Sequence, residues 1–308
     1  MKTPEKPSQK VLGKRPYILH RLFQYIISLS LSTGIYLSCL FPRYPEQFWA
    51  EIIAYKIGIL IGIEVPPAFV AVNKRENKTG AVIEWFLNYP GRDIEVKSSG
   101  SWYMQQIIKG YDLAKGTQHN FYAVKKLFEA LRMGRYKWNI NWIEYWVKTL
   151  AFDSLIGNTD RHQDNWGIIW KYKDKKLSPL RMTPVFDNGT SMGHEILENN
   201  FVDFENEEKI SKYVAKGYHH MKWKIDGSKR FSQVEFLREL LSEYPEMKNV
   251  VIGLMGFDVN KLEHDIMELT EFKVPCPLSD KRAKFIVKLL LFRRKNILLK
   301  LDNEHELY

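Results

Sequence analysis

Three side chains suited to phosphate chemistry lie within and after one polar run, residues 157–167 (GNTDRHQDNWG). Asp160 stands five positions before Asn165, and Asp187 follows Asn165 by 22 positions. Phosphoryl transfer needs a base or orienting carboxylate for the attacking hydroxyl, and oxygen ligands for the Mg²⁺ that bridges the phosphates. Asp160 supplies such a carboxylate, and Asn165 and Asp187 supply such ligands. The spacing therefore predicts a phosphotransferase site.

A structural loop is the alternative explanation for the same residues. Asp160 or Asn165 alone is better explained by local turn and cap hydrogen bonds. The combination with His162 and Asp187 favours the chemical interpretation. The protein-kinase signature has the same Asp-to-Asn spacing and a later Asp-Phe-Gly. Here the later segment is Asp-Asn-Gly, at 187–189, and the histidine follows the aspartate rather than preceding it.

The elements on either side of this loop should hold it in place. Apolar residues from Trp142 to Phe152 mark a helix that ends near Gly157. Two apolar runs, 167–172 and 180–186, flank a charged turn and predict a β-hairpin. Asp187 would then end the second strand, and the loop would be held by rigid elements on both sides.

The rest of the chain predicts a small mixed region followed by a mainly helical one. Polar, proline-containing residues 1–16 predict a flexible arm, and Ser98–Ser101 predict a loop. Asn120 and Ser279 are expected to cap helices. Expected strands lie at 69–73 and 80–86, and expected helices at 45–60, from 120, and at 231–243, 247–255, 258–270 and 279–301.

Composition narrows the function classes. The 308 residues carry a net charge of +10, which would attract polyanions, but the basic residues are spread along the chain. The clusters 281–284 and 293–295 are expected on polar faces of one helix. Direct nucleic-acid binding is not expected, since no basic face with interleaved aromatics is evident. His219 and His220 are expected at the surface rather than on a metal.

Cysteine usage and one uncharged stretch bear on localisation. Two cysteines without a CxxC pattern exclude a disulfide framework and a cysteine zinc site, and suit a reducing compartment. Residues 23–42 carry no charge and follow a basic start, which leaves a membrane anchor as an alternative. The period-two alternation at 28–32 and the turn at Thr33-Gly34 favour a soluble hairpin. We therefore expect a cytoplasmic protein.

At residues 155–167 and 184–189 the sequence resembles the HipA-like kinases. These are bacterial serine/threonine kinases, several acting as toxin components, with a fold related to phosphatidylinositol kinases. The resemblance implies an α+β, bilobal kinase-like fold with a small N-terminal lobe at 17–87 and a helical catalytic lobe at 88–308. It also implies use of ATP and Mg²⁺, a protein substrate with a Ser/Thr hydroxyl, and an antitoxin partner protein.

Carried over to this sequence, the resemblance assigns roles to single residues. Asp160 would be the catalytic base, Asn165 and Asp187 the Mg²⁺ ligands, and His162 a loop residue near the nucleotide phosphates. Residues Glu84, Trp85 and Phe86 would form the inter-lobe hinge that meets adenine. Glu51 matches the helix glutamate that pairs with a nucleotide-anchoring lysine. Helical periodicity alone instead predicts Glu51 on a solvated face.

The small lobe departs from the family pattern. The family has a lysine on the strand before this helix, and here the equivalent position is Leu40. A glycine-rich phosphate loop is also missing, with only Ser32-Thr33-Gly34 in its place. Such a lysine binds the α- and β-phosphates. Its absence supports an alternative function, a pseudokinase or interaction module that keeps the fold without turnover.

Overall fold

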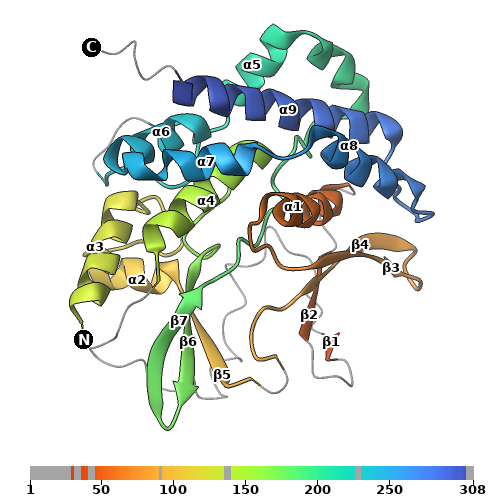
Figure 1. The fold of residues 1–308 in the computed structure, drawn as a ribbon. Coiled ribbons are helices and arrows are strands. Elements are labelled where there is room, and N and C mark those ends of the chain that lie inside the picture. Colours follow the sequence, from red (N-terminus) through yellow and green to blue (C-terminus); the bar gives the residue numbers. More distant parts are fainter. Residues whose placement is uncertain are drawn as a thin grey trace.

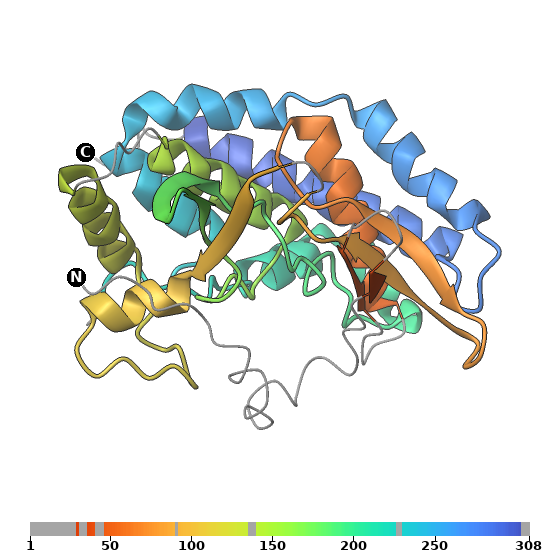
Figure 2. The ribbon, with the colours of Figure 1, turned by 90° about the horizontal axis from the view of Figure 1, so that it is seen from below.

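The computed structural model describes residues 29–30, 36–40, 46–89, 92–134, 140–225 and 230–302. Within these residues, two small antiparallel sheets lie on one side of a mainly helical body (Figure 1). Both views place α2 (Gly100–Ile107) and α3 (Phe121–Met133) at one end of the molecule (Figures 1 and 2). The hairpin of β3 (Ala68–Asn73) and β4 (Lys78–Glu84) lies at the other end. The expected arm 1–16 lies outside the described residues.

The four-stranded sheet has the order β1-β2-β4-β3. Its strands are β1 (Leu29–Ser30), β2 (Tyr36–Leu40), β3 (Ala68–Asn73) and β4 (Lys78–Glu84). Leu29 pairs with Leu37 in antiparallel register, which confirms the predicted hairpin for its described part. Among the described residues, no helix combines the length and apolarity needed to cross a membrane.

Helix α1 (Gln47–Ile61) packs against the four-stranded sheet and against α8 (Val259–Met267). It is buried on nearly all sides because apolar residues occur around most of its circumference rather than along one stripe. Gly62 ends it in the left-handed conformation, with φ of 73°. The glutamate within this buried helix, Glu51, is therefore carried into the interior.

The three-stranded sheet consists of β5 (Ile94–Ser99), β6 (Gly167–Lys173) and β7 (Lys176–Met182). The predicted loop at Ser98–Ser101 is wrong. Ser98 and Ser99 pair with β6, and Gly100 begins α2 (Gly100–Ile107). Pairing with a strand distant in sequence overrides the local turn preference of serine. Strand β7 also ends earlier than predicted, so Asp187 lies in the segment after it.

Helices form the larger part of the molecule. Helix α4 (Trp142–Ile156) lies against α6 (Gln233–Glu243), α7 (Lys248–Met255) and α9 (Asp280–Asp302). Asn120 Oδ1 accepts from Ala123 N, and Ser279 Oγ accepts from Arg282 N, as the predicted caps require. The remaining helices are α3 (Phe121–Met133), α4 (Trp142–Ile156), α5 (Glu207–Ala215), α6 (Gln233–Glu243), α7 (Lys248–Met255) and α9 (Asp280–Asp302).

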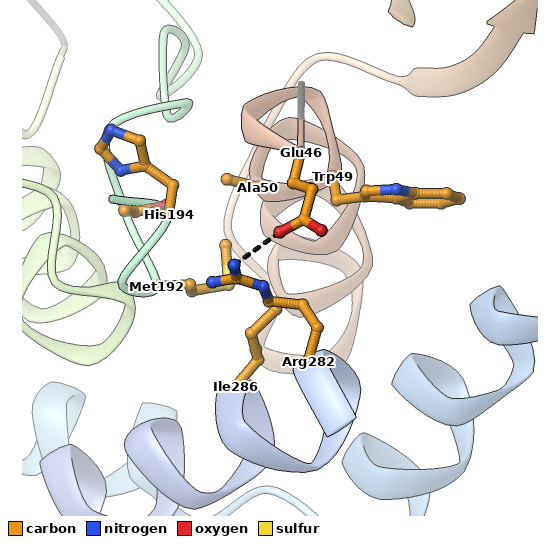
Figure 3. A pocket seen from close by; sticks show the side chains of 8 residues that line it. Glu46, Trp49, Ala50, Met192, His194, Arg282 and Ile286 are labelled. Carbon is orange, nitrogen blue, oxygen red and sulfur yellow. Dashed lines mark ion pairs between the residues drawn. The ribbon is translucent and has the colours of Figure 1, made fainter. Parts of the chain in front are cut away.

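The sequence predicted that both basic clusters on α9 lie on a polar face. This prediction is wrong for one residue of each cluster. Arg282 and Arg293 are both buried. Arg282 donates to Gly193 O and pairs with Glu46, the residue just before α1, at 2.5 Å (Figure 3). Because α9 is covered on several sides, Arg282 and Arg293 point into the protein and bind partners there. The ion pair of Arg282 with Glu46 fastens the start of α1 to α9.

Candidate active site

The polar loop begins where α4 ends. Gly157 caps the helix in the left-handed conformation, with φ of 75°, and its N–H donates to Asp153 O at 2.8 Å. The loop ends at Gly167, the first residue of β6. The sequence prediction of a loop between a helix and a strand is therefore confirmed, and both ends of the loop are anchored.

Arg161 lies at the centre of the loop and is fully buried. Its Nε and Nη2 donate to the two carboxylate oxygens of Asp153 on α4, at 3.0 and 2.7 Å. Its Nη1 donates to Asn165 O at 3.3 Å and to Phe186 O. Its Nη2 also donates to Asn188 Oδ1 at 2.8 Å. One side chain therefore joins α4, the polar loop and the segment around Asp187.

A second side chain, Asn158, holds the same two segments together. Its Nδ2 donates to Asp187 O at 3.3 Å. Its Oδ1 accepts from Asp160 N and from Thr190 Oγ1, both at 3.0 Å. Its own carbonyl accepts from Gln233 Nε2 on α6. The backbones of Asp160 and Asp187 are thus tied to one buried amide.

Asp160, Asn165 and Asp187 come together as the spacing predicted. Asn165 Nδ2 donates to Asp160 O at 2.9 Å. Burial and the nearby Asp160 carboxylate raise the pKa of Asp187, while His162 and the Asn165 side chain lower it. Burial also raises the pKa of Asp160. Two neighbouring carboxylates with raised pKa values form a site that favours a cation.

The chemistry of these donors fits Mg²⁺. A carboxylate and an amide oxygen are hard oxygen ligands, and Mg²⁺ usually binds one or two protein carboxylates together with water and substrate phosphates. Within the described ranges, no cluster of three or more His, Cys, Asp or Glu side chains could hold a metal ion by itself. Asn165 and Asp187 would therefore share the ion with phosphate oxygens.

Glu51 reaches the same segment from α1. Its Oε1 accepts from the backbone N–H groups of Asn188 and Gly189, both at 2.8 Å, and the residue is 4% exposed. Burial and then Asp187 raise the pKa of Glu51 to about 8. The solvated position predicted by periodicity alone is wrong, because α1 is buried on nearly all sides. Glu51 therefore lies in the interior, but its partners are backbone N–H groups rather than the lysine that the family resemblance implies.

Of the histidines near the loop, His162 lies in the loop as expected, whereas His219 does not lie at the surface. His162 donates its backbone N–H to Asp160 O at 2.8 Å, and its Nδ1 accepts from Asp164 N at 3.1 Å. Burial lowers the pKa of His162. His219, expected at the surface, is instead buried, with Nε2 3.7 Å from Asp153 Oδ2. An apolar region packs over it, since its ring lies 4.9 Å from that of Phe236.

The three residues predicted as a hinge lie at the end of β4. Glu84 accepts a hydrogen bond from the Tyr89 hydroxyl, and Trp85 is partly exposed. Phe86 is buried, stacks on Trp85 and lies 5.2 Å from the ring of Phe186, the residue before Asp187. Phe86 is therefore the hinge residue whose ring contacts the segment that carries Asp187.

Lys97 on β5 was missed by sequence reasoning. Its Nζ donates to Asp164 O at 3.2 Å and lies 4.2 Å above the Phe186 ring. Burial lowers the pKa of Lys97 to about 8, while the Asp164 and Asp187 carboxylates oppose this effect. The family pattern places its lysine before α1, whereas Lys97 lies on β5, after it in the chain. Its role depends on the pairing of β5 with β6, for which the sequence carries no local signal.

Comparison with known proteins supports the fold. No protein-family model and no curated protein sequence matches the chain. The crystal structure of the Helicobacter pylori proinflammatory kinase CtkA matches with a TM-score of 0.68 and 18% identity, over 89% of this chain and 92% of that chain. The chain therefore has a mixed α+β, kinase-like fold.

A more distant match is the HipA toxin of Shewanella oneidensis MR-1, solved with HipB and operator DNA. Its TM-score is 0.47 at 16% identity, over 88% of this chain and 61% of that chain. Hydra Fam20 with sugar matches with a TM-score of 0.35 at 13% identity, over 91% and 82%. These two likenesses are too low to bear on substrates or partners.

Proposed function

We propose that this chain is an ATP- and Mg²⁺-dependent phosphotransferase that acts on a hydroxyl group, as a HipA-like serine/threonine protein kinase. The kinase-like fold supports the class of reaction. The observation that carries the proposal is the joining of the Asp160 and Asp187 segments by two buried side chains, Arg161 and Asn158. These two side chains would hold the Asp160 and Asp187 carboxylates in fixed positions around the phosphoryl group to be transferred.

Each residue of the loop then has a role. Asp160 takes the proton of the acceptor hydroxyl, and its raised pKa makes it a stronger base than an exposed aspartate. Asn165 and Asp187 would hold Mg²⁺, whose positive charge would offset the negative charge of the phosphate oxygens. Lys97 on β5 supplies the cation that is missing from the strand before α1, beside Asp164 and Phe186.

A radiolabelled ATP transfer assay tests this proposal. With Mg²⁺ present, the chain should label itself or a generic protein acceptor. Asp160→Asn and Asp187→Asn should each lower the rate by about 10²-fold or more. Asp174→Asn is the matched control, because Asp174 is an exposed turn residue that an asparagine can replace. Equal rates in all four proteins would refute the proposed site.

A pseudokinase is the second candidate, and one contact favours it. Glu51 binds the backbone of Asn188 and Gly189, and no described lysine or arginine forms an ion pair with it. If Glu51 keeps this contact and never pairs with a nucleotide-anchoring lysine, the chain would bind Mg²⁺-ATP without turnover. Thermal stabilisation by Mg²⁺-ATP together with no Asp160-dependent labelling would support this alternative.

A further inference from the structure

Three arginines are buried within the described residues, and two of them have a carboxylate partner. Arg161 pairs with Asp153, and Arg282 pairs with Glu46. Arg293 on α9 is equally buried, yet no carboxylate in the described part of the chain lies within ion-pair distance of it. A buried cation without a counter-ion destabilises a folded protein. Arg293 therefore calls for an explanation.

The contacts of Arg293 are with neutral groups. Its Nη1 donates to Gln233 Oε1 at 2.9 Å and lies 3.5 Å from Ser154 O. Its Nε is buried and has no hydrogen-bond partner in the described structure. Burial lowers the pKa of Arg293, while Tyr213 and Glu195 act against this effect. Glu195 itself is exposed and accepts from the Tyr213 hydroxyl at 2.8 Å.

Arg293 lines a cavity of about 510 Å³ between α5, α6 and α9. This volume falls within the range of small-molecule sites. The lining also contains Arg230, Arg238 and Lys300, and none of the three forms an ion pair with a described residue. One acid, Glu235, lines the cavity, and its carboxylate accepts from Ser232 N in the capping box of α6. The lining thus carries an excess of positive charge.

We propose that this cavity binds a phosphate-bearing small molecule, with Arg293 at its inner wall and Arg230, Arg238 and Lys300 as further cationic contacts. Guanidinium groups suit phosphate because their N–H groups form a fork that matches two oxygens. Hydroxyl and amide groups of Ser211 and Asn296 add neutral donors. The phosphate would supply the negative charge that Arg293 lacks.

The cavity is separate from the proposed nucleotide site. Gln233 lies between the two, since it accepts from Arg293 on the cavity side and donates to Asn158 O in the polar loop. The inference therefore does not depend on the proposed function. The site would remain if the chain never bound ATP.

Thermal unfolding of the full chain in inorganic phosphate, against chloride at matched ionic strength, tests the proposal. Phosphate well above its Kd should raise the Tm by about 2 °C or more. The double variant Arg238→Ala/Lys300→Ala should weaken phosphate binding by about 10-fold or more. Lys295→Ala is the matched control, because Lys295 is exposed on the same helix but does not line the cavity.

Two further experiments show which site and which form of phosphate cause the rise in Tm. Lys97→Ala should leave the phosphate response intact, since Lys97 belongs to the other site. Glycerol phosphate, in place of inorganic phosphate, tells a phosphate ester from the free anion. The proposal is overturned if phosphate gives no stabilisation, or if the double variant keeps the full response to phosphate.

Discussion

Arg161 and Asp153 form a bidentate ion pair in which neither side chain is exposed to solvent. The pair joins the core of α4 to the polar loop. The same guanidinium binds both neighbours of Asp187, through the backbone oxygen of Phe186 and the side-chain Oδ1 of Asn188. The position of the candidate site therefore depends on one buried charge and its single carboxylate partner.

Asp153→Ala should destabilise the protein by about 3–5 kcal/mol, because it leaves Arg161 buried without a counter-ion. Urea unfolding measures this change in the free energy of unfolding. Lys212→Ala is the control, since it breaks an exposed pair with Glu208 at 2.6 Å and should cost no more than about 0.5 kcal/mol. Similar losses in the two variants would show that the buried pair is not a main support of the loop.

Glu51 should make stability fall as pH rises. Its pKa is about 8 in the folded protein against 4.5 for an ordinary glutamate, so the folded state holds the proton more tightly. Stability should therefore decline between about pH 4.5 and 8, on the order of a few kcal/mol, and level off outside this window. Glu51→Gln keeps the Oε1 acceptor and removes the ionisation, so it should flatten this part of the profile.

Unfolding of both proteins across pH, without nucleotide or metal, measures the difference. The wild-type and Glu51→Gln curves should converge near pH 4 and separate toward pH 8, with the variant more stable at pH 8. Parallel curves across the whole range would mean that Glu51 is not protonated in the folded state.

The sequence predicted the loop and most of its surroundings, because these depend on local signals. Helix α4, its glycine cap and the Asp-to-Asn spacing are all contiguous in the chain. Strand β5 was missed, and with it Lys97, since its partner β6 lies about 70 residues away. Glu51 and Arg293 were placed on solvated faces by periodicity, which fails for helices that are covered on several sides.

Lys97→Ala should weaken the binding of Mg²⁺-ATP by about 10-fold or more, because it removes a partly desolvated cation beside Asp187. Contact with the terminal phosphate would make the loss larger for ATP than for ADP. Calorimetric titration with each nucleotide measures both constants. Lys173→Ala, an exposed change on the neighbouring β6, should leave them unchanged. Equal losses for ATP and ADP would place Lys97 away from the terminal phosphate.

Alanine substitutions at Gly157 and Gly62 test how closely Arg293 packs against the end of α4. Both cap a helix with φ near 75°, at 75° and 73°. An alanine in this conformation costs about 1–2 kcal/mol at either position. A Cβ at Gly62 would meet nothing within 4 Å, whereas at Gly157 it would lie 2.6 Å from Cζ of Arg293. Gly157→Ala should therefore cost about 1–3 kcal/mol more than Gly62→Ala.

A double-mutant cycle with Arg293→Ala assigns that extra cost to the guanidinium. In the Arg293→Ala background, where the close contact is absent, Gly157→Ala should cost about as much as Gly62→Ala does in the wild type. Urea unfolding of the single and double variants supplies the values. If the excess cost of Gly157→Ala persists without Arg293, the strain comes from the backbone of the polar loop. In that case Arg293 does not pack against the helix cap as tightly as the 2.6 Å approach requires.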